Sequence, residues 1–454
     1  MKPNIFILIL DSFRADKCFG ENKTSKTPNL DNIRQKGIYF SQAISSSDQT
    51  GTSLASIFTG LFPFRTGLNE FNFKKEISTY FDILKNNGYR TYAIVPNIEF
   101  FSNLTDKFDE RVLYAYHDKE SWLKLENGLG NQITEHLRSN MKEPWTCFVH
   151  IMDIRPPFRI PAGFEDDVYG KTNYDKLVSS IDIWLGSFLK EINMEKTLIV
   201  LTADHGEYIP VTGEFLSEIP KIQNIITKGT KSVPFLKNIG MKTLLNLRFA
   251  AQTYRKEKLK RILSPYEMRS FNSRATLDLY DEIVRIPLLF VGYNVPHDKI
   301  VNELVRQVDI FPTILDIVGV NYEKEMDGRT SFPLINGEKQ EELSAYIEVG
   351  INLAQLLANK NRKMLPKVIG IRTSEYKYYR LLDEKEKNAS LFDLKNDPKE
   401  ENNIAVTNPA LVVKMESLLD SIQNSLKNTT EDVSDEEIRK AKEELVKLGY
   451  FGSL

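Results

Sequence analysis

Cysteine is nearly absent from this chain of 454 residues, which contains only Cys18 and Cys147. Two cysteines cannot supply the disulfide framework of small secreted domains, so a reducing cytosol is the simpler setting. Long apolar runs are missing as well. The run Ile5–Leu10 ends at a carboxylate and is too short for a signal-peptide core or a membrane span. We therefore expect a cytoplasmic protein whose first apolar run is a buried strand.

An excess of charge of one sign is also lacking. The formal net charge is −2, with 41% hydrophobic and 27% charged residues, and no biased or repetitive tract suggests disorder or an internal repeat. This composition is typical of a folded globular protein and argues against extended disorder. The overall charge balance gives no indication of nucleic-acid binding, and it leaves the oligomeric state open.

Short apolar runs alternate with helical patterns over the first two thirds of the chain. Such alternation predicts an α/β fold with a mostly parallel sheet sandwiched by helices. The expected strands are Ile5–Leu10, Thr91–Val95, Thr146–Ile151, Leu198–Thr202 and Ile286–Val291, with a helix near Pro28–Lys36.

The pattern changes near residue 335, which predicts a main domain at 1–335 and a smaller α+β subdomain at 336–454. The second part has expected strands at Ala345–Val349, Val368–Thr373 and Tyr376–Leu382, a helix at Pro409–Leu426 and a charged terminal helix at Asp432–Leu448.

Polar residues follow several of the expected strands, where parallel sheets bind their ligands. Asp11 follows the first strand, Asp204 and His205 follow another, and Thr50 precedes a Ser/Ala-rich helical stretch. Two carboxylates, an imidazole and a hydroxyl form a mixed O/N set suited to a divalent cation. A cation there would lower the pKa of the Thr50 hydroxyl, and the helix amino terminus would attract anionic oxygens. These residues predict a nucleophile site for anionic esters.

Several motifs occur in a characteristic order along the chain. They are Ile7-Leu8-Ile9-Leu10-Asp11-Ser12, Thr27-Pro28-Asn29-Leu30-Asp31, Thr59-Gly60-Leu61-Phe62-Pro63, Leu201-Thr202-Ala203-Asp204-His205-Gly206-Glu207, Leu279-Tyr280-Asp281-Glu282, Val308-Asp309-Ile310-Phe311-Pro312-Thr313 and Leu391-Phe392-Asp393-Leu394. In this order they resemble the sulfatase branch of the alkaline phosphatase superfamily over nearly the whole chain. The resemblance implies an alkaline-phosphatase-like fold and hydrolysis of sulfate or phosphate esters. It also implies one divalent metal ion, Mn, Ca, Mg or Zn, held by Asp11, Thr50, Asp204 and His205.

The nucleophile motif departs from the family pattern. Counted back from Thr59-Gly60, the family has a Cys or Ser for conversion to formylglycine at the position of Thr50, with Pro and Arg where this chain has Thr52 and Leu54. Threonine cannot become the formylglycine aldehyde, so Thr50 is expected to attack directly. This substitution favours phosphoryl over sulfuryl chemistry. An ordinary helix N-cap is the competing interpretation of Thr50.

Further site residues follow from the resemblance. In His150-Ile151-Met152-Asp153-Ile154-Arg155, the family has a substrate-facing histidine where this chain has Arg155, and a guanidinium can bind an anion at two points. His150 is expected to be either catalytic or structural. Asn97 falls where relatives have a polar substrate-side residue. Arg274 is the nearest cation before Tyr280-Asp281-Glu282, where relatives have a His or Lys.

A basic insertion occupies about residues 210–275. Between Lys221 and Arg274 it has thirteen Lys or Arg and two acidic residues, interleaved with apolar side chains. It is expected to be either a lid that attracts an anionic membrane surface or a polyanion, or a solvated helix face.

Three functions remain open on this evidence. The leading hypothesis is a metal-dependent hydrolase of sulfate or phosphate esters with Thr50 as nucleophile. The insertion suggests a phospho-head-group or sulfo-group transferase acting on a lipid or polysaccharide. The scarcity of histidine, five in the whole chain, suggests a non-catalytic binding protein that retains the fold.

Overall fold

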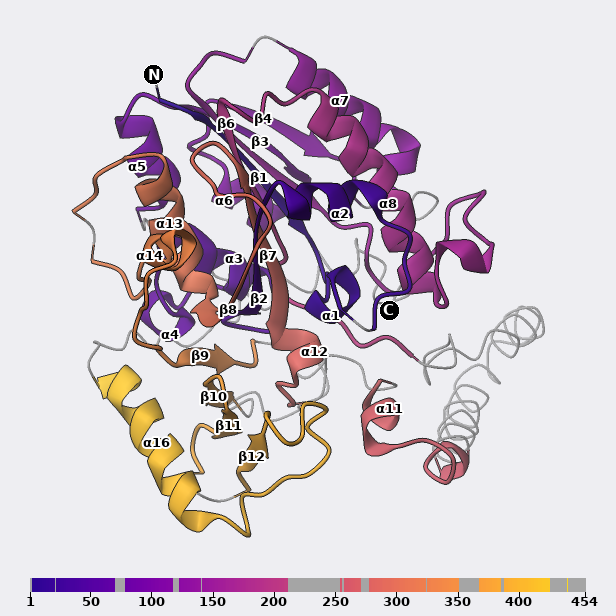
Figure 1. The fold of residues 1–454 in the computed structure, drawn as a ribbon, viewed down its shortest axis with the longest axis vertical. Helices are drawn as coiled ribbons and strands as arrows, with labels where there is room; N and C mark the ends of the chain where they lie inside the picture. Colours follow the sequence, from indigo (N-terminus) through magenta and orange to yellow (C-terminus); the bar gives the residue numbers. More distant parts are fainter. Residues whose placement is uncertain are drawn as a thin grey trace. The chain divides into compact units, whose positions relative to one another are not determined.

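The computed structural model describes most of the chain (Figure 1). The described residues are 2–20, 22–69, 78–116, 122–139, 141–210, 254, 257–270, 277–323, 325–350, 367–384, 388–424 and 439. They form two compact units, one of 1–207, 277–398 and 402–454, and the other of 208–276 with 399–401.

A large mixed sheet forms the centre of the first unit. Within the described residues it has eight strands in the order β4-β3-β5-β1-β6-β7-β2-β8, and β7 alone runs antiparallel to its neighbours. The strands are β1 Asn4–Leu10, β2 Gly37–Ile44, β3 Arg90–Pro96, β4 Glu110–Tyr114, β5 Trp145–Ile151, β6 Thr197–Thr202, β7 Arg285–Gly292 and β8 Lys299–Arg306. Every residue of the central strands β1, β5 and β6 is buried, as expected for parallel strands covered on both faces.

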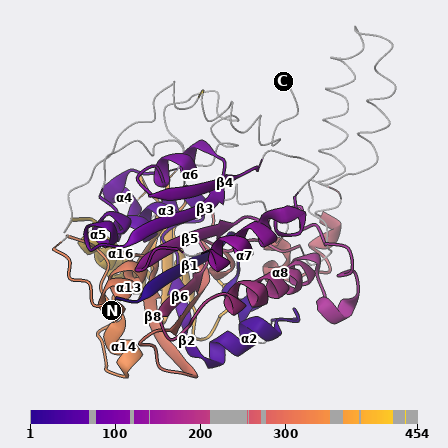
Figure 2. The same cartoon turned by 90° about the horizontal axis from the view of Figure 1, so that it is seen from above.

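Helices cover both faces of this sheet (Figures 1 and 2). One face carries α2 Pro28–Gln35, α7 Gly130–Arg138 and α8 Asn173–Lys190; the other carries α3 Thr50–Thr59, α5 Tyr80–Asn86, α6 Glu99–Leu104 and α13 Ile310–Ile317. Short helices and turns complete the unit: α1 Ala15–Cys18, α4 Pro63–Thr66, η1 Leu125–Leu129, η2 Asp167–Tyr169, α12 Asp281–Val284, η4 Gln307–Asp309 and α14 Phe332–Asn336.

A smaller antiparallel sheet follows in the order β12-β11-β10-β9. Its strands are β9 Ala345–Glu348, β10 Val368–Arg372, β11 Tyr376–Leu381 and β12 Ser390–Asp393, and it packs against α16 Pro409–Asn424. The mostly parallel sheet with a smaller α+β part confirms the predicted fold class. The boundary near residue 335 stays a prediction, and most of the expected helix Asp432–Leu448 lies outside the described residues.

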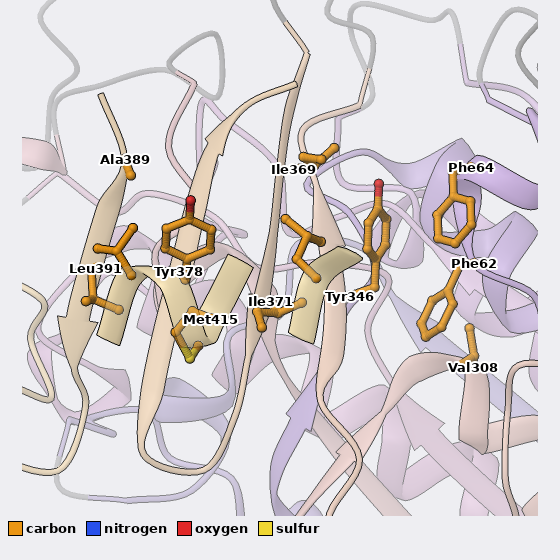
Figure 3. Packing of buried hydrophobic residues seen from close by; sticks show 12 residues of the cluster. Phe62, Phe64, Val308, Tyr346, Ile369, Ile371, Tyr378, Ala389, Leu391 and Met415 are labelled. Carbon is orange, nitrogen blue, oxygen red and sulfur yellow. The ribbon is translucent and has the colours of Figure 1, made fainter. Parts of the chain in front are cut away.

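The smaller sheet shares an apolar core with the segment that follows α3 (Figure 3). Phe62 and Phe64 pack on Tyr346 of β9, with ring centroids 5.5 and 4.8 Å from the tyrosine ring. Burying a side chain of this size contributes roughly 1.5–3 kcal/mol. Since Thr50 opens α3, this core anchors the helix that carries the expected nucleophile.

The second unit contains α11 Pro265–Arg269. Ser264 and Glu267 form a capping box at its start, and the Arg269 guanidinium donates hydrogen bonds to the carbonyls of Lys399 and Glu400. Residues 211–253 of the basic insertion lie outside the described part of the chain, so its role as a lid or membrane contact stays a prediction. Within the described residues, no helix is both long and apolar enough to cross a membrane.

Candidate active site

Three of the predicted residues converge at the carboxyl edge of the main sheet. Asp11 follows β1, and Asp204 and His205 follow the neighbouring strand β6. All three side chains are buried, and one potential ligand atom from each lies within 4.8 Å of the others. Parallel strands bring residues that directly follow them to one edge, which is why distant parts of the sequence meet here.

The turn after β1 is held in an uncommon backbone conformation. Ser12 has a φ of 65°, which is rare for a residue other than glycine. Its hydroxyl donates to Asp11 Oδ1 at 2.6 Å, its N–H donates to Asp204 Oδ1 at 3.1 Å, and its carbonyl accepts from the Tyr174 hydroxyl. These bonds compensate for the strain and join the two carboxylates through one residue.

Asp204 has one oxygen that faces the cluster. Its Oδ1 accepts hydrogen bonds from the N–H groups of Ser12 and His205, whereas its buried Oδ2 has no hydrogen-bond partner within the described part of the chain. Burial alone would raise the pKa of this carboxyl, but His205, His150 and the backbone N–H of His205 together lower it. A buried carboxylate oxygen without a hydrogen-bond donor fits a metal ion.

His205 presents one ring nitrogen to the same point. Its Nδ1 lies 2.8 Å from the Gly206 carbonyl, which can only accept, so Nδ1 carries a proton and Nε2 is the ring nitrogen that a cation would contact. A Cβ on Gly206 would lie 2.0 Å from the Glu282 carbonyl oxygen, so only glycine fits there. The set of Asp11, Asp204 and His205 therefore fits a divalent cation by its chemistry.

Thr50 lies beside this set. Its hydroxyl is 3.4 Å from Asp11 Oδ2 and 3.2 Å from His205 Nε2. The N-cap of α3 is Gln49, and Thr50 is the first helical residue, so Thr50 does not fill the N-cap role that was its competing interpretation. The positive end of the α3 dipole lies at Thr50. The position therefore suits a hydroxyl that acts on an anion.

His150 and Arg155 also lie at the site. His150 is fully buried at the end of β5, packs against Phe101, and has its Nε2 3.8 Å from Asp204 Oδ2. Arg155 Nε lies 3.9 Å from Asp11 Oδ1, and its guanidinium donates to the Tyr116 hydroxyl. Arg155 therefore lies beside Asp11, and its predicted role in binding an anionic oxygen of the substrate stays a prediction.

Asn97 and Arg274 are not brought to the cluster by the described contacts. Asn97 is exposed, and its N–H donates to the Tyr114 carbonyl; no described hydrogen bond joins its side chain to Asp11, Thr50, Asp204 or His205. Arg274 lies outside the described residues. Their substrate-binding roles stay predictions.

Sequence reasoning missed two side chains next to Arg155. The Tyr116 ring lies 5.6 Å from the Arg155 guanidinium carbon and 6.0 Å from the Lys124 ammonium, as measured to the ring centroid. Lys124 is buried. Neither belongs to a recognisable motif, and only the end of β4, next to β3 in the sheet, brings Tyr116 to this edge.

Comparison with known families gives two matches. Residues 3–320 match the model of the sulfatase family, described as "Sulfatase". Residues 267–432 match the model described as "N-sulphoglucosamine sulphohydrolase, C-terminal". The two matches overlap and together cover both sheets.

Individual relatives are distant but match over most of their length. The chain is 23% identical to arylsulfatase K of Canis lupus familiaris, over 93% of this chain and 82% of that protein. It is 21% identical to a Delta 4,5-hexuronate-2-O-sulfatase of Bacteroides thetaiotaomicron, over 89% and 85%.

Solved structures share the fold. A phosphonate monoester hydrolase of Agrobacterium radiobacter superposes with a TM-score of 0.67 at 17% identity, covering 93% of this chain and 96% of that one. A 2-O GAG sulfatase superposes with a TM-score of 0.64 at 18% identity, covering 95% of each chain.

Proposed function

This chain belongs to the sulfatase family, and from that premise we propose that it hydrolyses anionic sulfate or phosphate esters with Thr50 as nucleophile. The observation that carries the proposal is the position of the Thr50 hydroxyl. It lies within 3.4 Å of both Asp11 and His205, at the position where family members have the residue converted to formylglycine.

Asp11, Asp204 and His205 would hold one divalent cation, with the Thr50 hydroxyl next to them. Such a cation, when bound, lowers the pKa of a neighbouring hydroxyl and polarises the bound ester oxygens. Hard carboxylate oxygens with one imidazole are compatible with Mn, Mg, Ca or Zn, so the donor set does not select one metal.

Thr50 starts the proposed reaction. Asp11 Oδ2 accepts the hydrogen bond of the Thr50 hydroxyl and orients its oxygen toward the ester. The Thr50 proton passes to Asp11 as the Thr50 oxygen forms a bond to sulfur or phosphorus, the bond to the alcohol oxygen breaks, and the alcohol leaves with a proton from His150. Water then attacks the same sulfur or phosphorus atom and gives a proton to His150, while the bond to the Thr50 oxygen breaks and Thr50 recovers its proton from Asp11.

His150 and Arg155 serve different parts of this reaction. Arg155, next to Asp11, binds nonbridging oxygens of the ester through its planar guanidinium. It cannot donate a proton near neutral pH, so the departing alcohol needs another source. His150 is the titratable ring nearest to Asp204 on the β5 side and is assigned that role.

The distant relatives suggest which substrates to test first. They are named an arylsulfatase and a hexuronate-2-O-sulfatase, so aryl sulfates and 2-O-sulfated hexuronates belong in the panel. Nitrophenyl phosphate and phosphonate esters belong there too, because a threonine attacks without the formylglycine step that sulfatases use.

Turnover of this panel by metal-stripped protein resupplied with Mn, Mg, Ca or Zn tests the proposal, with Thr50→Ala and Thr50→Ser as paired variants. We expect metal-dependent turnover that Thr50→Ala loses by roughly 1,000-fold and Thr50→Ser largely keeps. Full activity in Thr50→Ala would end the nucleophile assignment. Tight binding of the esters without turnover by any metal form would favour the binding-protein alternative. Transfer of the anionic group to an added alcohol would favour a transferase.

A further inference from the structure

Three chain segments meet next to the proposed metal-ligand set of Asp11, Asp204 and His205. They are the loop Ser45–Gln49 between β2 and α3, Asp204 after β6, and Gln307 at the start of η4. In the sheet, β7 lies between β6 and β2, so the ends of these two strands are two strand spacings apart, roughly 10 Å. The hydrogen bonds between neighbouring strands therefore do not join the loop Ser45–Gln49 directly to Asp204.

The side chain of Gln307 makes that direct connection. Gln307 is fully buried, and its Nε2 donates to the Asp204 carbonyl at 2.8 Å. Its Oε1 accepts from the Ser46 N–H at 3.0 Å. A carbonyl on one side and an N–H on the other allow only one orientation of the amide. The amide thus connects the two segments in a defined geometry.

Ser45 supplies a second bond to the same carbonyl. Its hydroxyl donates to the Asp204 carbonyl at 2.6 Å and accepts from the Ser47 N–H at 3.3 Å. The two loops also bond to the backbone of α12, through Ser45 N–H to Val284 and Gly206 N–H to Ile283. Of these connections, only the Gln307 amide and the Ser45 hydroxyl join the loops to each other.

We propose that Gln307 and Ser45 are positioning residues that hold Asp204 in register with the loop leading to Thr50. The Asp204 carboxylate and the Thr50 hydroxyl must meet at one cation, and a small shift between their loops weakens both contacts. The inference rests on the proposed function, because it requires Asp204 to be a metal ligand.

Gln307→Glu tests the proposal because it changes only the chemistry of the amide. A carboxylate at this place cannot donate to the Asp204 carbonyl and repels it, whereas a protonated carboxyl restores the donor. We expect Mn²⁺ affinity, measured by titration calorimetry, to fall roughly 10- to 100-fold relative to wild type at pH 8. At pH 5.5 the Mn²⁺ affinity of Gln307→Glu should approach that of wild type at the same pH. A buried carboxyl keeps its proton to higher pH than an exposed one, so the introduced glutamate is then protonated.

A matched control is Gln340→Glu. The Gln340 side chain donates to the Thr330 carbonyl at 2.9 Å, a bond of the same kind outside the metal-ligand set. Its Mn²⁺ affinity should equal that of wild type at both pH values. A change of thermal midpoint in Gln307→Glu with unchanged Mn²⁺ affinity would show a structural role only and overturn the inference.

Ser45→Ala keeps the test decisive if Gln307→Glu does not fold. It should lower Mn²⁺ affinity by a pH-independent factor of roughly 3 to 10, because one of the two donors on the Asp204 carbonyl is lost. Equal affinity in Ser45→Ala and wild type would also reject the inference. A wild-type protein that binds no Mn²⁺ would instead refute the proposed metal site, and this inference with it.

Discussion

Two charged clusters, one buried and one partly buried, lie at the same edge of the main sheet and have opposite compositions. The proposed metal-ligand set contains two carboxylates and one imidazole, and Asp204 Oδ2 has no hydrogen-bond partner among the described residues. The second cluster has one carboxylate, Asp281 of α12, against three cations, Arg285, Arg372 and Lys377. Lys377 Nζ lies 2.5 Å and Arg372 Nη2 lies 3.2 Å from the Asp281 carboxylate.

The pKa of Asp281 shows how the protein itself satisfies the second cluster. Burial alone would raise this pKa, but the charges of Lys377, Arg372 and Arg285 together hold it well below its usual value. Arg372 and Lys377 belong to β10 and β11, so the pairing joins the smaller sheet to α12. Charges that the protein pairs internally hold the fold, whereas charges that it leaves for an external ligand serve function.

Asp204→Asn should have the largest effect on activity. The amide removes a charged ligand, and we expect Mn²⁺ affinity to fall by at least about 100-fold and kcat/KM by roughly 1,000-fold. The metal-stripped variant should melt only a few °C below metal-stripped wild type. The amide oxygen still accepts from the N–H groups of Ser12 and His205, but the attraction of His205 and His150 that lowers the pKa of the carboxylate is lost. A large loss of stability without metal would place Asp204 among the residues that hold the fold. Calorimetry and kinetics on one preparation give all three values.

Asp281→Asn should show the reverse pattern. Removing the Asp281 carboxylate takes away the ion-pair partner that Lys377 and Arg372 share, and breaking such a pair costs roughly 3–5 kcal/mol. The thermal midpoint should fall by roughly 3–5 °C in a chain of this size, while kcat/KM of the folded protein at low temperature stays within a few-fold of wild type.

Asp298→Asn is the control for Asp281→Asn, because the Asp298–Arg34 pair is 3.4 Å long and 68% of the aspartate side chain is exposed. An exposed pair of this kind is worth at most about 1 kcal/mol. If Asp281→Asn and Asp298→Asn melt alike, the second cluster does not stabilise the fold as argued.

Arg155→Lys tests a residue between the two kinds of cluster, since Arg155 is next to Asp11 but bonds to Tyr116. A lysine keeps the charge but loses the two-point contact with an anion. We expect kcat/KM to fall roughly 10- to 100-fold, with Mn²⁺ affinity and thermal midpoint unchanged. Arg159→Lys is the control, because Arg159 is exposed and lies over the Trp122 ring. Equal kinetics of both variants would remove Arg155 from the substrate site.

The sequence predicted the strands that are continuous apolar runs and the polar residues that directly follow them. The continuous runs of β1, β5, β6 and β7 were found, and with them the placement of Asp11 and Asp204. The strands β2, β4, β8 and β12 were missed. Strands β4 and β8 lie at sheet edges, where charged and exposed residues interrupt the apolar pattern.

The missed site residues share one physical cause. Gln307 follows the edge strand β8, Tyr116 follows the edge strand β4, and the partners of Asp281 come from the second sheet. Their neighbours are decided by strand order and by the packing of the two sheets. A single sequence carries little information on strand order or on how two sheets pack. A glutamine or tyrosine outside a motif therefore cannot be distinguished by sequence from an ordinary core or surface residue.

Substitution of Asp153 has the smallest expected effect. It tests the rule that charges paired within the protein hold the fold, whereas charges left for a ligand serve function. Its carboxylate is buried after β5 and accepts from the Leu125 N–H. Burial raises its pKa from the usual 3.8 to about 7, against the opposing effects of that bond and of Lys124, while Glu126 adds to the rise. Between these pH values the native state holds more protons than the unfolded state, so stability falls as pH rises. The loss of folding stability from the Asp153 charge is complete above about pH 7.

Asp153→Asn removes this titration and keeps an acceptor for Leu125. The thermal midpoint of wild type should fall between pH 5 and pH 7.5. The thermal midpoint of Asp153→Asn should fall less over the same range, by a difference of a few °C. Asp166→Asn is the control, since that residue is exposed and caps a short 3₁₀ turn. Parallel pH curves for wild type and Asp153→Asn would mean that Lys124 compensates the Asp153 charge as fully as Lys377 and Arg372 compensate Asp281. Asp153 would then belong with the charges that hold the fold.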